Sequence, residues 1–563
     1  MTESASVKFH RRSFLAWCGG LGLGSGLFPG ALWAQSAGGC ESITSAMIDA
    51  AASLAGLHIS AVDREEMVAG INANLASYEA LRKIRIDQNV PPPLYFNPAV
   101  PGQTFSNERA PFVRGARSIV RRPQNLEDIA FWPVTDLSQL IESRQVSSQE
   151  LTRMYLDRVH RYDPVLHCVI TLTEELAIEQ AVQADREIAA GNYRGALHGI
   201  PWGAKDVIAK RGYRTTWGSE AYREQTLDLD ATVVARLEEA GAVLLAKLST
   251  GEIARGDRWF DKQTRNPWKT DEGSGGSSAG PASATSAGLV GFSIGTDTTG
   301  SILGPSRTCG ISGLRPTFGR VSRHGVMPVC WSLDKVGPIC RSVEDCAIVF
   351  EVIRGPDNLD LAVVDMPFNW DGNGSLEGLR VGYLQDAFGD DTDVNDTATL
   401  ESLRSLGVKL RPIRLPKHAG MDALQMLLVD EAAAFDELIQ TGRVDLLIQD
   451  RDEPEDMLMR VARLLPAVEY VQIHRLRMLM MQGMEKALRN IDVYVSPHSG
   501  SPNTSATSLT GHPAISVPNG FDDDGKPTGI LFVGKLYSEA DLMTVAKAYQ
   551  DANAFHLSQP PLS

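Results

Sequence analysis

Residues 271–306 read "DEGSGGSSAGPASATSAGLVGFSIGTDTTGSILGPS". After Glu272 this stretch has almost no charge and is crowded with glycine and serine, a composition typical of a flexible linker. However, the apolar run Leu289 to Phe292 interrupts it, and "CGISGLRPT" follows it. Because a linker is not expected to bury apolar side chains, we predict a structured loop region held by apolar strands.

Serine and glycine together in such a loop are compatible with acyl-transfer chemistry. A serine hydroxyl is a poor nucleophile until a base takes its proton. A reacting carbonyl also needs backbone N–H donors directed at the developing oxyanion, and glycine-rich turns present such donors without side chains in the way. The composition alone leaves a plain loop as the alternative.

Two nucleophile patterns occur in this region, and neither fits its context. Gly276 to Gly280 matches GxSxG, but this pattern should follow a buried strand. The preceding "TRNPWKTDEGSG" is not predicted as a strand, and no HGGG-type motif accompanies it. Ser332 to Lys335 matches SxxK, but neither SDN nor KTG follows. We therefore reject both patterns.

From about Phe131 onward, helical and strand patterns alternate. Two helices are predicted in residues 136–163, the second opened by Ser147 with Glu150 three positions later. A strand, a helix ended by Gly191, and a helix–turn–strand unit follow up to residue 249, and a strand–helix pair closes the chain. This alternation predicts an α/β fold, a sheet covered by helices on both faces. Residues 376–492 show no clear pattern.

The N-terminal residues 1–34 resemble a twin-arginine export signal. Arg11 and Arg12 precede a short, glycine-broken apolar stretch, which ends in a small-residue exit at Ala31-Leu32-Trp33-Ala34. An uncleaved membrane anchor is the alternative, but the stretch is short for a span. We therefore expect a removable signal, a periplasmic or secreted protein, and no stable membrane insertion of the mature chain.

A helical extension and connector are predicted for residues 41–130. Ser60 resembles a helix start, and Met67, Ile71 and Leu75 keep helical spacing. Proline and glycine then favour an extended connector over residues 100–124. The third predicted domain, residues 131–557, contains the alternating pattern.

Composition limits the classes of partner and cofactor. The chain has 563 residues, 43% of them hydrophobic, and a net charge of −15, which disfavours a nucleic-acid partner. Cys18 lies in the signal, and the other cysteines form no CxxC pair; no HExxH motif occurs either. We predict no metal and no cofactor. The oligomeric state stays open, a homodimer being one option.

Several long motifs, taken in order, resemble the amidase signature family. They are "LHGIPWGAKDVIAKRGYRTTWGS" (197–219), "GSGGSSAGPASA" (273–284), the segment 291–347 from "GFSIGTDTTGS" to "RSVEDCA", and "TGHPAISVPNGFDDDGKPTGILFVG" (510–534). The resemblance covers roughly residues 131–555. It implies a single large mixed β-sheet flanked by helices.

The resemblance also implies a Ser–Ser–Lys triad. Ser301 would attack the amide carbonyl, and Ser277, which follows a cis peptide bond in the family, would relay its proton to a neutral Lys205. A lysine that acts as a base needs a pKa lowered by burial. The alternative for Lys205 is a salt bridge with its neighbour Asp206, and spacing alone does not separate the two.

The oxyanion donors implied by the resemblance are the backbone N–H groups of Thr298, Thr299, Gly300 and Ser301. Thr299 stands where the family usually has glycine, so a positive φ there would be strained. Leu303 replaces the family's usual arginine, which removes a cation near the carboxylate of Asp297.

Other residues in the motifs receive plainer interpretations. We expect loop or core positions for His324, His498 and His512, and buried packing for Cys309. Met327 and Trp331 could line the acyl pocket, although core packing is as good an explanation.

The sequence thus predicts an exported amidase that hydrolyses a C–N amide bond of a small-molecule substrate through a covalent acyl-enzyme. One alternative is the amidase subunit of an aminoacyl-tRNA amidotransferase, which requires partner subunits. The other is an inactive binding protein on the same scaffold.

Overall fold

The computed structural model describes residues 42–54, 57–82, 96–389, 392–416, 424–448, 455–498 and 502–562. The predicted signal, residues 1–34, lies outside the described residues, as do Cys18 and Cys40. Contacts divide the chain into two compact units, residues 1–89 with 424–474 and residues 90–423 with 475–563. The domain boundaries drawn from the sequence stay a prediction.

The first unit is helical. Its N-terminal helices are α3 (Ser45–Leu54) and α4 (Ala61–Arg82), and the hydroxyl of Ser60 accepts a hydrogen bond from the N–H of Asp63, as expected for a helix start. The buried side chains of Ile48, Met67 and Val461 form its apolar centre. Its other helices are α13 (Leu424–Ala434), α14 (Asp436–Thr441), η5 (Arg443–Leu446), α15 (Glu455–Ala462) and the start of α16 (Ala467–Leu488). All five of these helices lie within residues 376–492, where the sequence showed no clear pattern.

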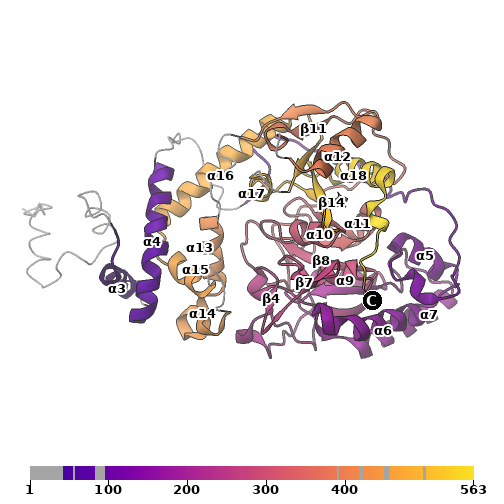
Figure 1. The fold of residues 1–563 in the computed structure, drawn as a ribbon, viewed down its shortest axis with the longest axis horizontal. Helices are drawn as coiled ribbons and strands as arrows, with labels where there is room; N and C mark the ends of the chain where they lie inside the picture. Colours follow the sequence, from indigo (N-terminus) through magenta and orange to yellow (C-terminus); the bar gives the residue numbers. More distant parts are fainter. Residues whose placement is uncertain are drawn as a thin grey trace, which may run out of the picture. The chain divides into compact units, whose positions relative to one another are not determined.

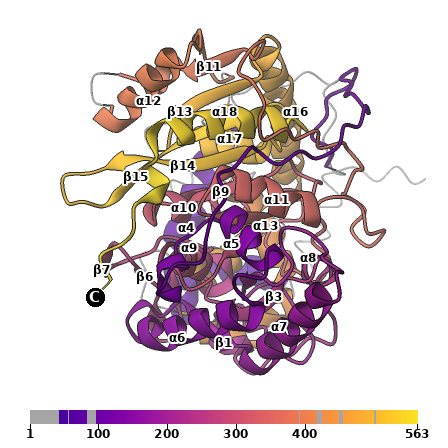
Figure 2. The same ribbon diagram turned by 90° about the vertical axis from the view of Figure 1, so that its right-hand side faces the viewer.

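The second unit is built on an eleven-stranded mixed sheet, which confirms the predicted fold class (Figures 1 and 2). Its strand order is β1-β3-β2-β8-β10-β9-β14-β15-β13-β11-β12. The strands are β1 (Val169–Leu172), β2 (Pro201–Lys205), β3 (Val243–Leu248), β8 (Phe292–Asp297), β9 (Ser312–Arg315), β10 (Lys335–Cys340), β11 (Val381–Leu384), β12 (Arg411–Ile413), β13 (Val493–Pro497), β14 (Ala514–Phe521) and β15 (Pro527–Gly534).

Helices pack against the central strands of the sheet, from β3 to β13 in the strand order. Those beside β2, β3 and β8 are α6, α7 and α9, and those beside β9, β10, β14 and β15 are α10, α11, α12 and α18. The bounds are η1 (Leu126–Ile129), α5 (Val134–Glu142), α6 (Ser148–Leu166), α7 (Glu174–Ala189), η2 (Glu220–Tyr222), α8 (Thr232–Glu239), η3 (Glu252–Ala254), α9 (Ala279–Ser286), α10 (Leu303–Thr308), α11 (Val343–Ile353), η4 (Gln385–Ala387), α12 (Val394–Ser405), α17 (Asn503–Leu509), α18 (Glu539–Asn553) and η6 (Phe555–Leu557). No helix of the described part of the chain is both long enough and apolar enough to span a membrane.

The strand directions bring chemically useful residues to one edge of the sheet. Strand β2 runs parallel to β8, so Lys205 and Asp297, which end these two strands, lie at the same edge. Strand β10 is antiparallel to both β8 and β9. Its first residue, Lys335, therefore pairs with Asp297, and Arg315 at the end of β9 reaches the same edge.

The apolar run in the opening stretch is explained by this sheet. Leu289, Val290 and Phe292 are fully buried, and Phe292 begins β8. The expectation that no strand precedes the GxSxG pattern is wrong, because Lys269–Gly273 form β7. This strand pairs only with β6 (Arg265–Asn266) in a small separate sheet and is largely solvent-facing, unlike the buried strand that the pattern requires. A second small sheet joins β4 (Arg258–Trp259) and β5 (Lys262–Gln263).

Candidate active site

Lys205 is one of the fully buried residues among the predicted site residues. Its side chain is fully buried at the end of β2, where Nζ lies 2.8 Å from Oγ of Ser277 and 2.9 Å from Oγ1 of Thr296. Burial lowers the pKa of Lys205 to about 7, although the charges of Asp297 and Asp334 oppose the shift. A large fraction of this amine is therefore uncharged near neutral pH, as a general base requires.

The alternative pairing of Lys205 with Asp206 is wrong. The carboxylate of Asp206 accepts a hydrogen bond from Nζ of Lys247 on β3 at 2.7 Å, and both side chains are fully buried. It also accepts from the N–H and the hydroxyl of Thr216. Successive side chains of an extended chain point to opposite faces, so neighbours in sequence face different surroundings.

Ser277 lies in a tight backbone turn before α9. The Gly276–Ser277 peptide bond is cis, as the family resemblance implies. A Cβ atom at Gly276 would lie 1.8 Å from the carbonyl oxygen of Gly256, so only glycine fits there. The next residue, Ser278, holds the turn against β8, because its hydroxyl donates to the carbonyl of Thr296 and accepts from the N–H of Thr296.

Ser301 lies directly beside this turn. Its carbonyl oxygen accepts a hydrogen bond from the N–H of Ser278 at 3.0 Å, which ties the two serine-bearing segments together. The positive φ in the Ser301 loop belongs to Gly300, at +130°, and Thr299 has a negative φ. The strain expected for threonine at position 299 is therefore absent.

Asp297 organises the loop that contains the predicted oxyanion donors. Its carboxylate accepts hydrogen bonds from the N–H groups of Gly300 and Ile302, both at 2.9 Å. Burial favours a raised pKa for Asp297, but the charges of Arg315 and Lys335 and the two N–H donors lower the pKa below its usual value. The N–H of Gly300 is thus committed to Asp297, which corrects its assignment as an oxyanion donor. The donors that remain from the prediction are the N–H groups of Thr298, Thr299 and Ser301.

The arginine missing at position 303 is compensated from elsewhere. Leu303 is buried in an apolar cluster with Tyr494, Leu531 and other residues. The cation facing Asp297 comes instead from the end of β9, where Nη1 of Arg315 lies 3.5 Å from Oδ1 of Asp297. Support of the Asp297 carboxylate is therefore retained.

Three groups that were not predicted as site residues complete the surroundings of Lys205 and Asp297. Thr296 is a second hydrogen-bond partner of Lys205. Nζ of Lys335 donates to the carbonyl of Thr298 at 3.3 Å, and burial lowers the pKa of Lys335 to about 7. Asp334 accepts from the Thr298 hydroxyl at 2.7 Å. The pairing of β8 with β10 brings these residues together. Local spacing in the sequence does not reveal that pairing, so it offered no signal for them.

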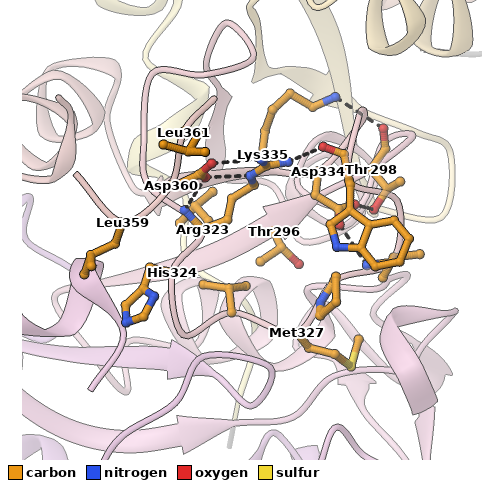
Figure 3. A pocket seen from close by; sticks show the side chains of 15 residues that line it. Thr296, Thr298, Arg323, His324, Met327, Asp334, Lys335, Leu359, Asp360 and Leu361 are labelled. Atoms are coloured by element: carbon orange, nitrogen blue, oxygen red, sulfur yellow. Dashed lines mark hydrogen bonds and ion pairs between the residues drawn. The ribbon is translucent and has the colours of Figure 1, made fainter. Parts of the chain in front are cut away.

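A cavity of about 370 Å³ adjoins this edge of the sheet. Its wall includes Thr296 and Thr298 from the active-site side, and Figure 3 shows the Arg323–Asp360 pair to the left with Asp334 and Thr298 to the right. Because Thr296 contacts both the cavity and Lys205, the cavity opens next to the candidate catalytic groups.

The remaining predicted residues take the positions expected from the plainer interpretation or line the cavity. Burial lowers the pKa of His498 and that of His512 to about 3, so both rings are neutral. Cys309 is a buried free thiol, as are the other cysteines in the described ranges. His324, Met327 and Trp331 line the cavity, so the pocket interpretation of Met327 and Trp331 is supported. Ser332 accepts from Arg477 rather than serving Lys335, consistent with rejection of SxxK.

The fold and the site together define an α/β protein with a Ser–Ser–Lys cluster at a sheet edge. The Amidase family matches residues 150–509, and the chain belongs to this family. It is therefore an enzyme that acts on amide C–N bonds. A curated relative, a glutamyl-tRNA(Gln) amidotransferase subunit of Methylococcus capsulatus, is 34% identical over 76% of this chain and 98% of its own. The corresponding subunit of Marinomonas sp. is 33% identical over 76% of this chain and 98% of its own.

Solved structures of the family superpose on most of the chain. The peptide amidase of Stenotrophomonas maltophilia is 32% identical and covers 77% of this chain and 99% of its own, with a TM-score of 0.69. The same glutamyl-tRNA(Gln) amidotransferase subunit from Thermotoga maritima is 26% identical and covers 75% and 95%, with a TM-score of 0.61.

Proposed function

We propose that this protein hydrolyses an amide C–N bond through a covalent acyl-enzyme formed on Ser301. The observation that carries the proposal is the hydrogen bond of 2.8 Å between the buried amine of Lys205 and the hydroxyl of Ser277. Together with the lowered pKa of Lys205, at about 7, it supplies a base that is partly free of its proton near neutral pH.

Acylation would proceed through the two serines. Lys205 takes the proton of Ser277 while Ser277 takes the proton of Ser301, and Oγ of Ser301 forms a bond to the amide carbonyl carbon. The carbonyl electron pair moves onto oxygen, and backbone N–H groups of the loop 298–301 stabilise the oxyanion. When the oxyanion collapses, the C–N bond breaks, and the proton held by Lys205 returns through Ser277 to the departing amine.

Deacylation repeats the sequence with water as the nucleophile. The water transfers a proton through Ser277 to Lys205, its oxygen attacks the ester carbonyl, and Ser301 leaves with the returned proton. One amide and one water are consumed, and one carboxylic acid and one amine are released. No redox partner is needed for this balance.

A fluorophosphonate probe tests the nucleophile directly. We expect covalent labelling of Ser301 in the folded protein, loss of labelling after heat unfolding, and no labelling of Ser301→Ala. Labelling at another serine, or no labelling of the folded chain, would remove Ser301 from this role. The second outcome would also favour the inactive-scaffold alternative, against which family membership and the Lys205–Ser277 contact argue.

A second candidate is the amidase subunit of an aminoacyl-tRNA amidotransferase. The curated relatives named above, at 33–34% identity and 98% coverage of their chains, support this candidate more directly than they support an exported amidase. The similarity to the peptide amidase supports a free-standing enzyme instead. Co-purification of the tagged chain from its native cell separates the two, because the amidotransferase role requires stable partner subunits.

We also propose export by the twin-arginine route, on the residues Arg11 and Arg12 and the apolar stretch after them. Fractionation followed by N-terminal sequencing tests it. A mature chain beginning near residue 35 outside the cytoplasm supports export, and an intact N-terminus in the cytoplasm contradicts it and strengthens the amidotransferase candidate.

A further inference from the structure

The cavity beside the active site combines buried charged groups with an apolar wall. Its charged or titratable members are Arg323, Asp334, Lys335, Asp360 and His324, and Thr296 and Thr298 add two hydroxyl groups. Its apolar members come from three short segments and are Val326, Met327, Pro328, Val329, Trp331, Val336, Leu359 and Leu361. The volume, about 370 Å³, is within the range of small-molecule sites.

The charges on this wall are balanced by one another. The guanidinium of Arg323 contacts both carboxylate oxygens of Asp360, at 2.8 and 3.0 Å, and also the carbonyl of Trp331. Arg323 and Asp360 therefore form a closed pair that offers a substrate no unpaired charge. Binding a charged substrate group here would require breaking an existing pair.

Asp334 is equally committed, and Lys335 is buried, which lowers its pKa to about 7 and reduces its charge near neutral pH. The carboxylate of Asp334 accepts from the Thr298 hydroxyl and from the N–H groups of Val329 and Cys330, at 2.7 to 2.9 Å. Nζ of Lys335 donates to the Thr298 carbonyl. Among the described lining residues, His324 adds an imidazole for a hydrogen bond to a substrate.

The rim of the cavity is unusually apolar for a solvent-facing surface. Trp331, Leu359 and Leu361 are 50%, 60% and 81% exposed, and all three line this cavity. Exposed apolar side chains that gather at one opening mark a binding surface, whereas isolated ones need no explanation. A ligand with an apolar group would cover them.

We propose that this cavity binds a bulky, uncharged apolar group of the substrate, such as an aryl or branched alkyl group, and thereby excludes free glutamine as the preferred amide. The inference rests on the proposed amide hydrolysis and names its substrate class. Glutamine carries an ammonium and a carboxylate beside its side chain, and both would lose water without gaining an unpaired counter-charge on this wall.

The test compares amides with the full purified chain. The kcat/KM values are measured for phenylacetamide, hexanamide, acetamide and L-glutamine by ammonia release, and for acetanilide by aniline release. We expect phenylacetamide to exceed both acetamide and glutamine by roughly 10- to 100-fold, the gain for burying an aromatic group. An advantage of phenylacetamide over acetamide places the apolar group on the acyl side of the amide, and an advantage of acetanilide over acetamide shows that an apolar group on the amine side is also accepted. Preference for glutamine or acetamide overturns the proposal.

A pair of exposed substitutions ties the preference to the cavity. Leu361→Asp places a charge at the rim, and Val394→Asp places one at a residue of similar exposure, 76%, on α12 outside the cavity. We expect the phenylacetamide-to-acetamide ratio of kcat/KM to fall at least tenfold in Leu361→Asp and to stay within twofold in Val394→Asp. An unchanged ratio in Leu361→Asp, or an equal fall in both variants with intact melting curves, overturns the proposal.

The fluorophosphonate probe separates the substrate class from the reaction itself. Labelling of Ser301 without a preference for apolar amides contradicts only the substrate class. Absence of labelling contradicts the proposed hydrolysis, and the substrate class falls with it.

Discussion

A lysine amine can act as a base near neutral pH only where its surroundings disfavour the charged form. At Lys205 burial supplies that effect and lowers the pKa to about 7, while Asp297 and Asp334 limit the shift. The proposed nucleophile, Ser301, is half-buried and lies in a loop. In the proposed mechanism, Lys205 holds the proton and Ser301 forms the bond to the substrate.

Ser301→Ala should abolish amide turnover and leave the melting temperature within a few degrees of wild type. The reason is that the variant removes the nucleophilic oxygen while the backbone hydrogen bond from Ser278 to residue 301 remains. Steady-state turnover of the preferred amide and a calorimetric scan provide the two readouts. Turnover above one per cent of wild type would mean that another group attacks the carbonyl.

The protonation of Lys205 also predicts a pH effect on stability. An unfolded lysine has a pKa of about 10.4, whereas the pKa of Lys205 in the folded chain is about 7. Between these values the unfolded state binds more protons, so this residue makes the free energy of unfolding rise as the pH increases from 7 to 10. In Lys205→Met the rise should be shallower, because this contribution is gone and that of Lys335 remains.

Urea unfolding at pH 7, 8, 9 and 10 measures the difference. The lost hydrogen bonds to Ser277 and Thr296 shift the stability of the variant at every pH and do not produce the change of slope. Parallel curves for wild type and variant would show that Lys205 is charged in the folded protein throughout this range.

At the scale of elements, the loop between β8 and α10 depends on contacts from distant strands. Asp297 anchors the loop, Arg315 of β9 faces Asp297, and Leu303 packs into an apolar cluster. The position at which the family usually has arginine has therefore become part of the core in this chain.

Restoring that arginine should be harmful. Leu303→Arg would bury a guanidinium among Tyr494, Leu531 and other apolar side chains, and Asp297 already has its cation. We expect a loss of roughly 3–5 kcal/mol in the free energy of unfolding, typical of an unpaired buried charge, measured by urea denaturation. Leu303→Met is the matched control, since it keeps volume and polarity and should cost less than about 1.5 kcal/mol. Equal stability of Leu303→Arg and wild type would refute this interpretation of position 303.

Local signals predicted many elements correctly. Ser147 and Glu150 form the capping box that opens α6, and Gly191, with φ of +88°, follows the end of α7. The sequence also identified the residues that the structure brings together around Lys205. It did not reveal Thr296, Arg315 or Lys335 as their partners, because these contacts depend on strand order.

The Lys205–Asp206 salt bridge, left open by the sequence, is contradicted for the same reason, because partners are set by strand order. The residue nearest in sequence to Lys205 was a reasonable partner for it, but the actual partner of Asp206 is Lys247, 41 positions away on the adjacent strand. The longer helices within residues 376–492, α12, α13 and α16, have apolar residues with little helical periodicity, and α15 is amphipathic but only eight residues long, so the sequence did not separate helix from strand there. Sequence patterns thus predict elements better than they predict contacts between elements.

At the scale of the whole molecule, the two candidate functions differ in what the chain needs. A free-standing amidase acts alone, whereas the amidotransferase role requires partner subunits. We expect the purified chain to hydrolyse phenylacetamide without ATP, tRNA or any other protein, with the rate per chain constant over a hundredfold dilution. Activity that appears only after addition of a fraction containing partner subunits would contradict this expectation.

The proposed mechanism requires that the uncharged amine of Lys205 draws the proton from Ser301 through Ser277. The decisive measurement is the rate of Ser301 labelling by a fluorophosphonate between pH 5 and 10, in wild type and in Lys205→Met. We expect a wild-type rate that rises through an ionisation near pH 7 and then levels, and a variant slowed by roughly 100- to 10,000-fold that lacks this ionisation. A variant that keeps the same inflection, or that reacts at nearly the wild-type rate, would show that Lys205 is not the base.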